Sequence, residues 1–129
     1  MRNIFIFEDD QKRIDQFKKY LKDDNLVITD NIDIAKKILK DQTFDVALLD
    51  HDMDHQIFVE STSKNTGFQV ASFIVQENIP FHQVIVHSHN PVGAENMMHV
   101  LNKYGTNIKN LHRVPFADLI GILKFSGGK

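Results

Sequence analysis

The stretch FDVALLDHDMD, residues 44–54, joins a short apolar run to an abrupt polar end. Phe44 and residues 46–49 are apolar, which suits a strand buried on both faces of a sheet. Carboxylates and imidazoles follow at once, at Asp50, His51, Asp52, Asp54 and His55. Ligands of open α/β sheets lie outside the carboxyl ends of the strands, so this point is a candidate site. The alternative is an acidic loop with no ligand.

Length and composition restrict the classes of protein to which the chain can belong. Its 129 residues suit one domain, and 42% hydrophobic with 25% charged residues is an ordinary globular composition. With a formal net charge of −2, the chain has no overall positive charge that would attract nucleic acid or an anionic membrane. There is no cysteine, so neither disulfides nor thiol chemistry is expected. We expect the first residues to be neither a signal peptide nor a membrane span, and the protein to be cytoplasmic.

Strand and helix patterns alternate along the whole chain. Apolar runs predict strands at residues 4–7, 26–28, 44–49 and 84–86, and residues 111–114 are a fifth, weaker strand pattern. Apolar stripes at helical spacing predict five helices, carried by Ile14, Phe17 and Leu21; Ile34, Ala35, Ile38 and Leu39; Gly67, Val70, Ala71, Ile74 and Val75; Ala94, Met97, Met98 and Leu101; and Phe116, Leu119, Ile120 and Leu123. We therefore predict one domain over residues 1–125, with a flexible tail at residues 126–129.

Helix boundaries and one long connection can also be located. Asp30 or Asn31 is a suitable cap for the second helix, and Asn90 followed by Pro91 is a strong helix start. Residues 53–66 show no clear periodicity and are long for a strand–helix connection, which is typical of a lid or binding loop. A short strand or hairpin at residues 56–60 is a further possibility.

Five strand–helix units predict a parallel α/β sheet with helices on both faces. We expect the flavodoxin-like, doubly wound order 2-1-3-4-5, which places strands one, three and four side by side. Their carboxyl ends then bring together Glu8, Asp9, Asp10, Asp50, His51, Asp52, His87, Ser88, His89 and Asn90.

This edge of the sheet has the composition of a metal and phosphate site. Glu8, Asp9, Asp10 and Asp50 are the predicted metal ligands, because crowded carboxylates ionise readily only beside a cation. Oxygen ligands favour Mg²⁺ or Mn²⁺, and the nearby histidines leave Zn²⁺ as a second possibility. The helix that starts at Asn90, with Gly93 in its first turn, offers N–H groups to an anion.

Over nearly the whole chain the pattern resembles the response-regulator receiver domain, a CheY-like fold. Glu8–Asp9 resembles the acidic metal-binding pair of receivers, and FDVALLD resembles the strand that ends in their phosphorylated aspartate, here Asp50. Ser88 resembles their small hydroxyl residue, and Pro115–Phe116 follows the fifth strand as in receivers. Receivers place a lysine just before that proline, where this chain has Val114, with Arg113 one position earlier.

A narrower resemblance is to the cyclic-phosphate processing receiver-like domains of bacteria and their phages. The segments LDHDM (residues 49–53), TG (residues 66–67) and HSHNPVGAENM (residues 87–97) resemble the signatures of that family in the same order. The resemblance implies a receiver fold and the processing of a cyclic phosphate.

We expect Asp50, His51, Asp52, His87 and Ser88 to be the catalytic residues. His51, oriented by Asp52, would activate water or protonate the leaving oxygen, and His87 would carry the opposite proton transfer. The alternatives are a vestigial Asp50 and a His87 that is a hydrogen-bonded core residue. The predicted phosphate-binding residues are Ser88, Asn90, Gly93 and Arg113, with Arg113 a candidate for the missing cation.

Three classes of function remain open at this stage. The first is metal-assisted hydrolysis of a phosphodiester, and the expected substrate is a cyclic phosphate on a nucleotide or an RNA end. The second is a binding or signalling module on a receiver scaffold without turnover. The third is a degenerate phosphorelay receiver. All three predict a phosphate-containing partner, and none requires a membrane or an extended nucleic-acid surface.

Overall fold

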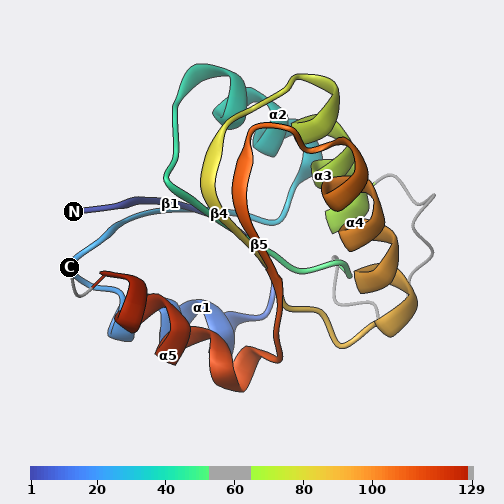
Figure 1. Cartoon of the computed structure of the whole chain (residues 1–129). Coiled ribbons are helices and arrows are strands. Elements are labelled where there is room, and N and C mark those ends of the chain that lie inside the picture. The colour runs from blue at the N-terminus through green and yellow to red at the C-terminus, as the bar shows by residue number, and fades with distance from the viewer. Residues whose placement is uncertain (53–64, 128–129) are drawn as a thin grey trace.

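The computed structural model describes residues 1–52 and 65–127. The elements in chain order are β1 (Asn3–Phe7), α1 (Gln11–Tyr20), β2 (Asn25–Thr29), α2 (Ile32–Asp41), β3 (Val46–Leu49), α3 (Gly67–Gln76), β4 (Phe81–Val86), α4 (Pro91–Tyr104), β5 (Ile108–Arg113) and α5 (Phe116–Gly127). Figure 1 shows strand and helix alternating along the chain. The predicted number and order of elements are confirmed.

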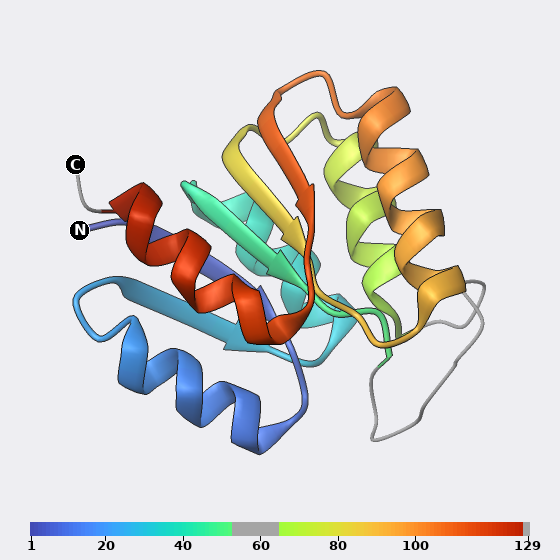
Figure 2. The ribbon, with the colours of Figure 1, turned by 60° about the horizontal axis from the view of Figure 1, so that its bottom comes forward.

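The five strands form one parallel sheet in the order β2-β1-β3-β4-β5, as predicted. The register pairs Phe7 with Leu49 and Leu49 with Val86, so the three central strands end at the same level. Their arrows point the same way in Figure 2. The residues that follow each strand are therefore placed at one edge of the sheet.

Helices cover both faces of the sheet, and each face has its own apolar core. Helices α1 and α5 lie on one face and α2, α3 and α4 on the other (Figures 1 and 2). Phe17 and Leu119 pack on the first face, whereas Val70 and Met97 pack on the second. None of the helices within residues 1–52 and 65–127 is long and apolar enough to cross a bilayer.

Side-chain caps fix the starts of three helices near the site. Asn31, one of the two predicted caps, accepts a hydrogen bond from the Ile34 N–H, and Asn90 accepts one from Gly93. Asp10 accepts hydrogen bonds from the N–H groups of Lys12 and Arg13. Each cap satisfies backbone donors that a helix leaves unpaired at its first turn.

The structure differs from the sequence predictions in its details. Ile34 is 52% exposed, because the buried face of α2 is formed by Ile32, Ala35 and Leu39. Strand β5 begins at Ile108, three residues earlier than predicted, and α5 continues to Gly127, beyond the predicted start of the tail. The predicted strand at residues 56–60 and most of the loop at residues 53–66 lie outside the described residues.

Candidate metal and phosphate site

The alternation of side chains along the central strands decides which polar residues meet. Residues 4 and 6 of β1, 46 and 48 of β3, and Ile85 of β4 pack on the α1/α5 face. Side chains along a strand alternate with a period of two, so the next residues in this series, Glu8, Asp50 and His87, are directed to the same face. His51, one residue after Asp50, is directed to the face covered by α3 and α4. Neighbours in sequence therefore belong to two different clusters.

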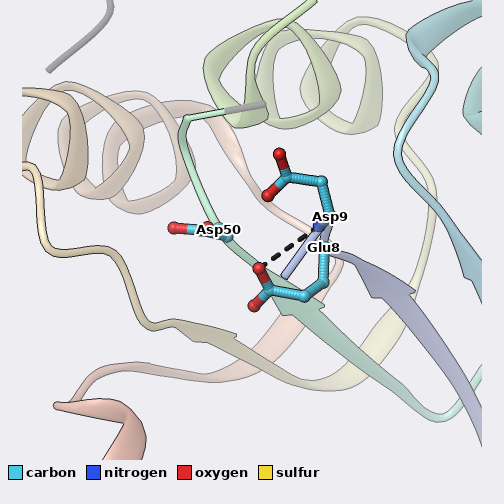
Figure 3. A group of neighbouring side chains, drawn as sticks. All are labelled: Glu8, Asp9 and Asp50. Carbon is cyan, nitrogen blue, oxygen red and sulfur yellow. Dashed lines mark hydrogen bonds between the residues drawn. The ribbon is translucent and has the colours of Figure 1, made fainter. Parts of the chain in front are cut away.

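Three carboxylates form a compact group just beyond the ends of β1 and β3. One oxygen each of Glu8, Asp9 and Asp50 lies within 4.8 Å of the others (Figure 3). Glu8 and Asp50 are buried, whereas Asp9 is half-buried. Oxygen Oε2 of Glu8 also accepts hydrogen bonds from the N–H groups of Asp9 and Asp10, at 3.3 Å each. The predicted grouping of Asp9 with Asp50 is confirmed.

Burial of this cluster changes the proton affinity of its carboxylates. Desolvation, together with the nearby Glu8 charge, raises the pKa of Asp50 to about 7. Desolvation also raises the pKa of Glu8, against the opposing effect of Arg13. A carboxylate that is hard to ionise next to two others is a site where a cation is strongly favoured.

Arg13 forms ion pairs with two of these carboxylates. Its Nη1 lies 3.6 Å from Glu8 Oε1 and 3.6 Å from Asp50 Oδ2, and its guanidinium carbon lies 5.2 Å from the centre of the Phe116 ring. Sequence reasoning proposed Arg113 for this place and missed Arg13. The available signal was its spacing, since Arg13 precedes the buried Phe17 by one helical turn and so shares its face.

His87 is buried next to this cluster and contacts it through Glu8. Its Nε2 lies 2.9 Å from Glu8 Oε1, and its ring packs edge-on against Phe17 and tilted against Phe116. Burial lowers the pKa of His87 to about 4, so the ring is neutral near pH 7 and its Nε2–H donates to Glu8. Its Nδ1 has no hydrogen-bond partner among the described residues.

His51 belongs to a second, hydrogen-bonded cluster on the other face. Its side chain is fully buried, and its Nδ1 lies 2.8 Å from Asp52 Oδ1, which also accepts from Asn90 Nδ2 at 3.1 Å. Gly93 donates its N–H to Asn90 Oδ1, and a Cβ at position 93 would meet the His51 ring within 2.7 Å. Gly93 is therefore needed for the close packing of His51 against the first turn of α4.

Two sequence-based predictions are corrected by this arrangement. The rings of His51 and His87 lie on opposite faces, so they do not face one substrate from two sides. The space at Gly93 is filled by the His51 ring, and the Gly93 N–H is used by the cap, so the expected approach of an anion at that point is not what the structure shows. Both corrections have one cause: side chains alternate between the two faces after β3, so His51 is directed to the face opposite to that of Asp50.

Other predicted residues lie around a shallow cleft next to the acidic cluster. The cleft has a volume of about 310 Å³ and is lined by His87, Ser88, His89, Arg113, Val114, Pro115 and Phe116. Ser88 and Arg113 are thus brought together, as their predicted phosphate-binding role requires. Asp10 lies outside the three-carboxylate group and caps α1 instead.

Comparison with known families gives this site a context. The profile of the family described as "Cyclic-phosphate processing Receiver domain" matches residues 4–103. The chain belongs to this family of receiver domains. A search of curated proteins found no match.

Solved receiver domains share the fold of this receiver domain. Mn²⁺-bound Rcp1 is 20% identical with a TM-score of 0.65, the alignment covering 98% of this chain and 94% of that one. The receiver domain of sensor histidine kinase PA1611 from Pseudomonas aeruginosa, with Mg²⁺ coordinated in its active-site cleft, is 14% identical with a TM-score of 0.62 and coverage of 99% and 98%. TrrA from Thermotoga maritima, in complex with Mg²⁺-BeF, is 15% identical with a TM-score of 0.62 and coverage of 98% and 97%.

The residues of this chain fit a divalent cation. The donors in the group are oxygens, and no histidine belongs to it within the described ranges. Hard oxygen donors suit Mg²⁺ and Mn²⁺ better than Zn²⁺, which prefers nitrogen and sulfur. Glu8, Asp9 and Asp50 are the residues that would hold the ion.

Proposed function

We propose that this receiver domain binds a cyclic phosphate next to a divalent cation held by Glu8, Asp9 and Asp50, and hydrolyses it to a monoester. The observation that carries the proposal is a group of three carboxylates linked through His87 to a neighbouring cleft, in a chain that belongs to the cyclic-phosphate processing family. The substrate class is a cyclic nucleotide or an RNA end. Mg²⁺ or Mn²⁺ is the proposed ion.

The cleft residues supply the remaining contacts. A bound divalent cation would polarise the phosphate and offset its charge. Ser88 and Arg113 line the cleft and would bind the phosphate and the sugar next to it. His87 donates to Glu8 and so holds one of the proposed ligands in place. A cytoplasmic location, for a protein encoded by a bacterium or a phage, stays a prediction from the sequence.

A second candidate function is binding without turnover. The observation that favours it is the burial of both predicted proton-transfer groups, since the side chains of His51 and His87 are 0% exposed. A general acid or base must come within hydrogen-bond reach of the reacting atoms. In this second reading, the domain recognises a cyclic phosphate and signals its presence.

One experiment separates these functions. The protein is incubated with 2′,3′-cyclic and 3′,5′-cyclic nucleotides and with RNA that ends in a 2′,3′-cyclic phosphate, each with Mg²⁺, Mn²⁺ or Zn²⁺. Products are followed by ³¹P NMR, and binding by the shift in melting temperature. Turnover that is lost in Asp50→Asn supports the hydrolase. Thermal protection without product supports the binding module, and neither effect in any combination contradicts the proposal.

A further inference from the structure

Arg13 occupies an unusual position between the acidic cluster and the cleft. Its side chain is only 13% exposed, and its Nη1 lies at the same distance, 3.6 Å, from one oxygen of Glu8 and one of Asp50. This separation exceeds the 2.7–2.9 Å or so of a charge-assisted hydrogen bond. The guanidinium is thus shared loosely between two carboxylates rather than locked to one of them.

The two oxygens that Arg13 approaches belong to two of the three proposed metal ligands. Glu8 Oε1 and Asp50 Oδ2 face the guanidinium, and Glu8 and Asp50 are both in the group of carboxylates able to hold a cation. A divalent ion in this group would neutralise the same negative charge. The attraction between Arg13 and the cluster would then fall, because the charge that produces it is offset.

Phe116 provides a second contact that does not depend on the carboxylates. The Arg13 guanidinium carbon lies 5.2 Å from the ring centre, within the range of a cation–π interaction. Phe116 also lines the cleft that contains Ser88 and Arg113. A guanidinium released from the carboxylates can therefore stay over Phe116, close to the place where the proposed function puts a phosphate.

We propose that Arg13 exchanges partners: it neutralises Glu8 and Asp50 while no metal is bound, and it pairs with the phosphate of the ligand once a divalent cation has taken its place. Arg13 thereby supplies the fixed cation that Val114 does not provide before Pro115. The exchange rests on the proposed function: its first half needs the proposed metal site, and its second half also needs a phosphate in the cleft.

The exchange predicts effects of opposite sign on the two ligands. Arg13→Gln removes a competing cation, so Mn²⁺ alone should bind roughly tenfold more tightly. The same variant removes a donor to the anion, so inorganic phosphate should bind roughly tenfold more weakly in saturating Mg²⁺. An Arg13 that only stabilises the fold would lower the melting temperature without this pair of opposite changes.

Electron paramagnetic resonance of free Mn²⁺ measures the first effect, and calorimetry with inorganic phosphate and with 2′,3′-cyclic AMP measures the second. Lys12→Gln is the matched control, because it removes one positive charge from the adjacent, exposed position of α1. We expect it to change either affinity by no more than about twofold. Arg13→Lys is the second variant should Arg13→Gln fold poorly. It keeps the charge and should leave Mn²⁺ binding unchanged while it weakens phosphate binding.

The outcomes separate this inference from the proposed function. Unchanged or weaker Mn²⁺ binding in Arg13→Gln overturns the exchange, and so does phosphate binding that does not depend on Arg13. Opposite changes with Mn²⁺ and inorganic phosphate, but no binding of the cyclic nucleotide to the wild type, support the exchange and contradict the proposed function.

Discussion

Two polar clusters lie at the same edge of the sheet, one on each face, and they are built in opposite ways. The cluster of His51, Asp52 and Asn90 is closed by hydrogen bonds of 2.8 and 3.1 Å and is covered by α4. The cluster of Glu8, Asp9 and Asp50 brings together groups of like charge, and the Arg13 guanidinium lies 3.6 Å from the carboxylates of Glu8 and Asp50. Satisfied networks stabilise a fold, whereas unbalanced charge favours a ligand. From this contrast we expect the first cluster to stabilise the fold and the second to bind a ligand.

The largest effect that would test this contrast is loss of the cation on removal of one carboxylate. Asp50→Asn keeps the shape of the side chain and removes its charge, so we expect Mn²⁺ affinity to fall by at least about a hundredfold. Asp10→Asn is the matched control, because asparagine caps a helix as well as aspartate does, and it should leave affinity unchanged. A comparable loss in Asp10→Asn would return Asp10 to the ligand set.

The pH dependence of cation binding should be the next largest effect. A pKa of about 7 at Asp50 means that a proton and the cation compete for one carboxylate. Below pH 7 or so, Mn²⁺ affinity should fall roughly tenfold for each pH unit, because one proton is released on binding. Titration at pH 5, 6, 7 and 8 checks this. A flat profile would show that Asp50 is already ionised.

The same raised pKa changes the free energy of unfolding without a metal. Between pH 3.8 and about 7, the folded state holds a proton on Asp50 that the unfolded state has lost. The contribution of Asp50 to the free energy of unfolding is therefore complete at low pH and is lost as pH rises through about 7. His87 acts in the opposite direction, because its pKa falls from 6.5 to about 4 and its contribution is lost on acidification. The difference between Asp50→Asn and the wild type isolates Asp50. In urea unfolding, the stability of Asp50→Asn relative to the wild type should increase from pH 4 to pH 8.

A substitution in the hydrogen-bonded cluster should affect stability rather than binding. Gly93→Ala places a Cβ against the His51 ring, and we expect a loss of about 1–3 kcal/mol in the free energy of unfolding. Gly121→Ala is the matched control, because nothing lies within 4 Å of its Cβ, and it should stabilise α5 by up to about 1 kcal/mol. Mn²⁺ affinity should stay the same in both. A changed affinity in Gly93→Ala would show that the two clusters are coupled.

The smallest expected effect is the absence of a covalent phosphate. Val114 stands where receivers carry lysine, and we expect the charge on a phosphoryl group at Asp50 to lack that fixed cation. Incubation with a small phosphodonor and Mg²⁺ should give no stable acyl phosphate by intact mass. A gain of about 80 Da, the mass of one phosphoryl group, that disappears in Asp50→Asn would restore the phosphorelay reading.

The fold could be predicted from the sequence because long apolar stripes and strong helix starts, such as Asn90–Pro91, carry their own signal. The sequence could also predict the grouping of Glu8, Asp9 and Asp50, because these residues follow two strands that are adjacent in the predicted strand order. Arg13 was missed because it comes from a helix rather than a strand end. His51 was grouped with Asp50 because the expected grouping followed strand ends alone and did not apply the period of two from Asp50 to His51.

The two ends of the segment at residues 53–64 are held by the framework itself. Asp52 and Thr66 form a bridge, and the Gly67 N–H donates to the His51 carbonyl at 2.8 Å. Asn65 is anchored to the start of α2, where it accepts from the Ile32 N–H and donates to the Asp30 carbonyl. Insertions or deletions between these anchors would therefore leave Asp50 where it is. An engineer can change the length of this connection without redesigning the proposed metal site.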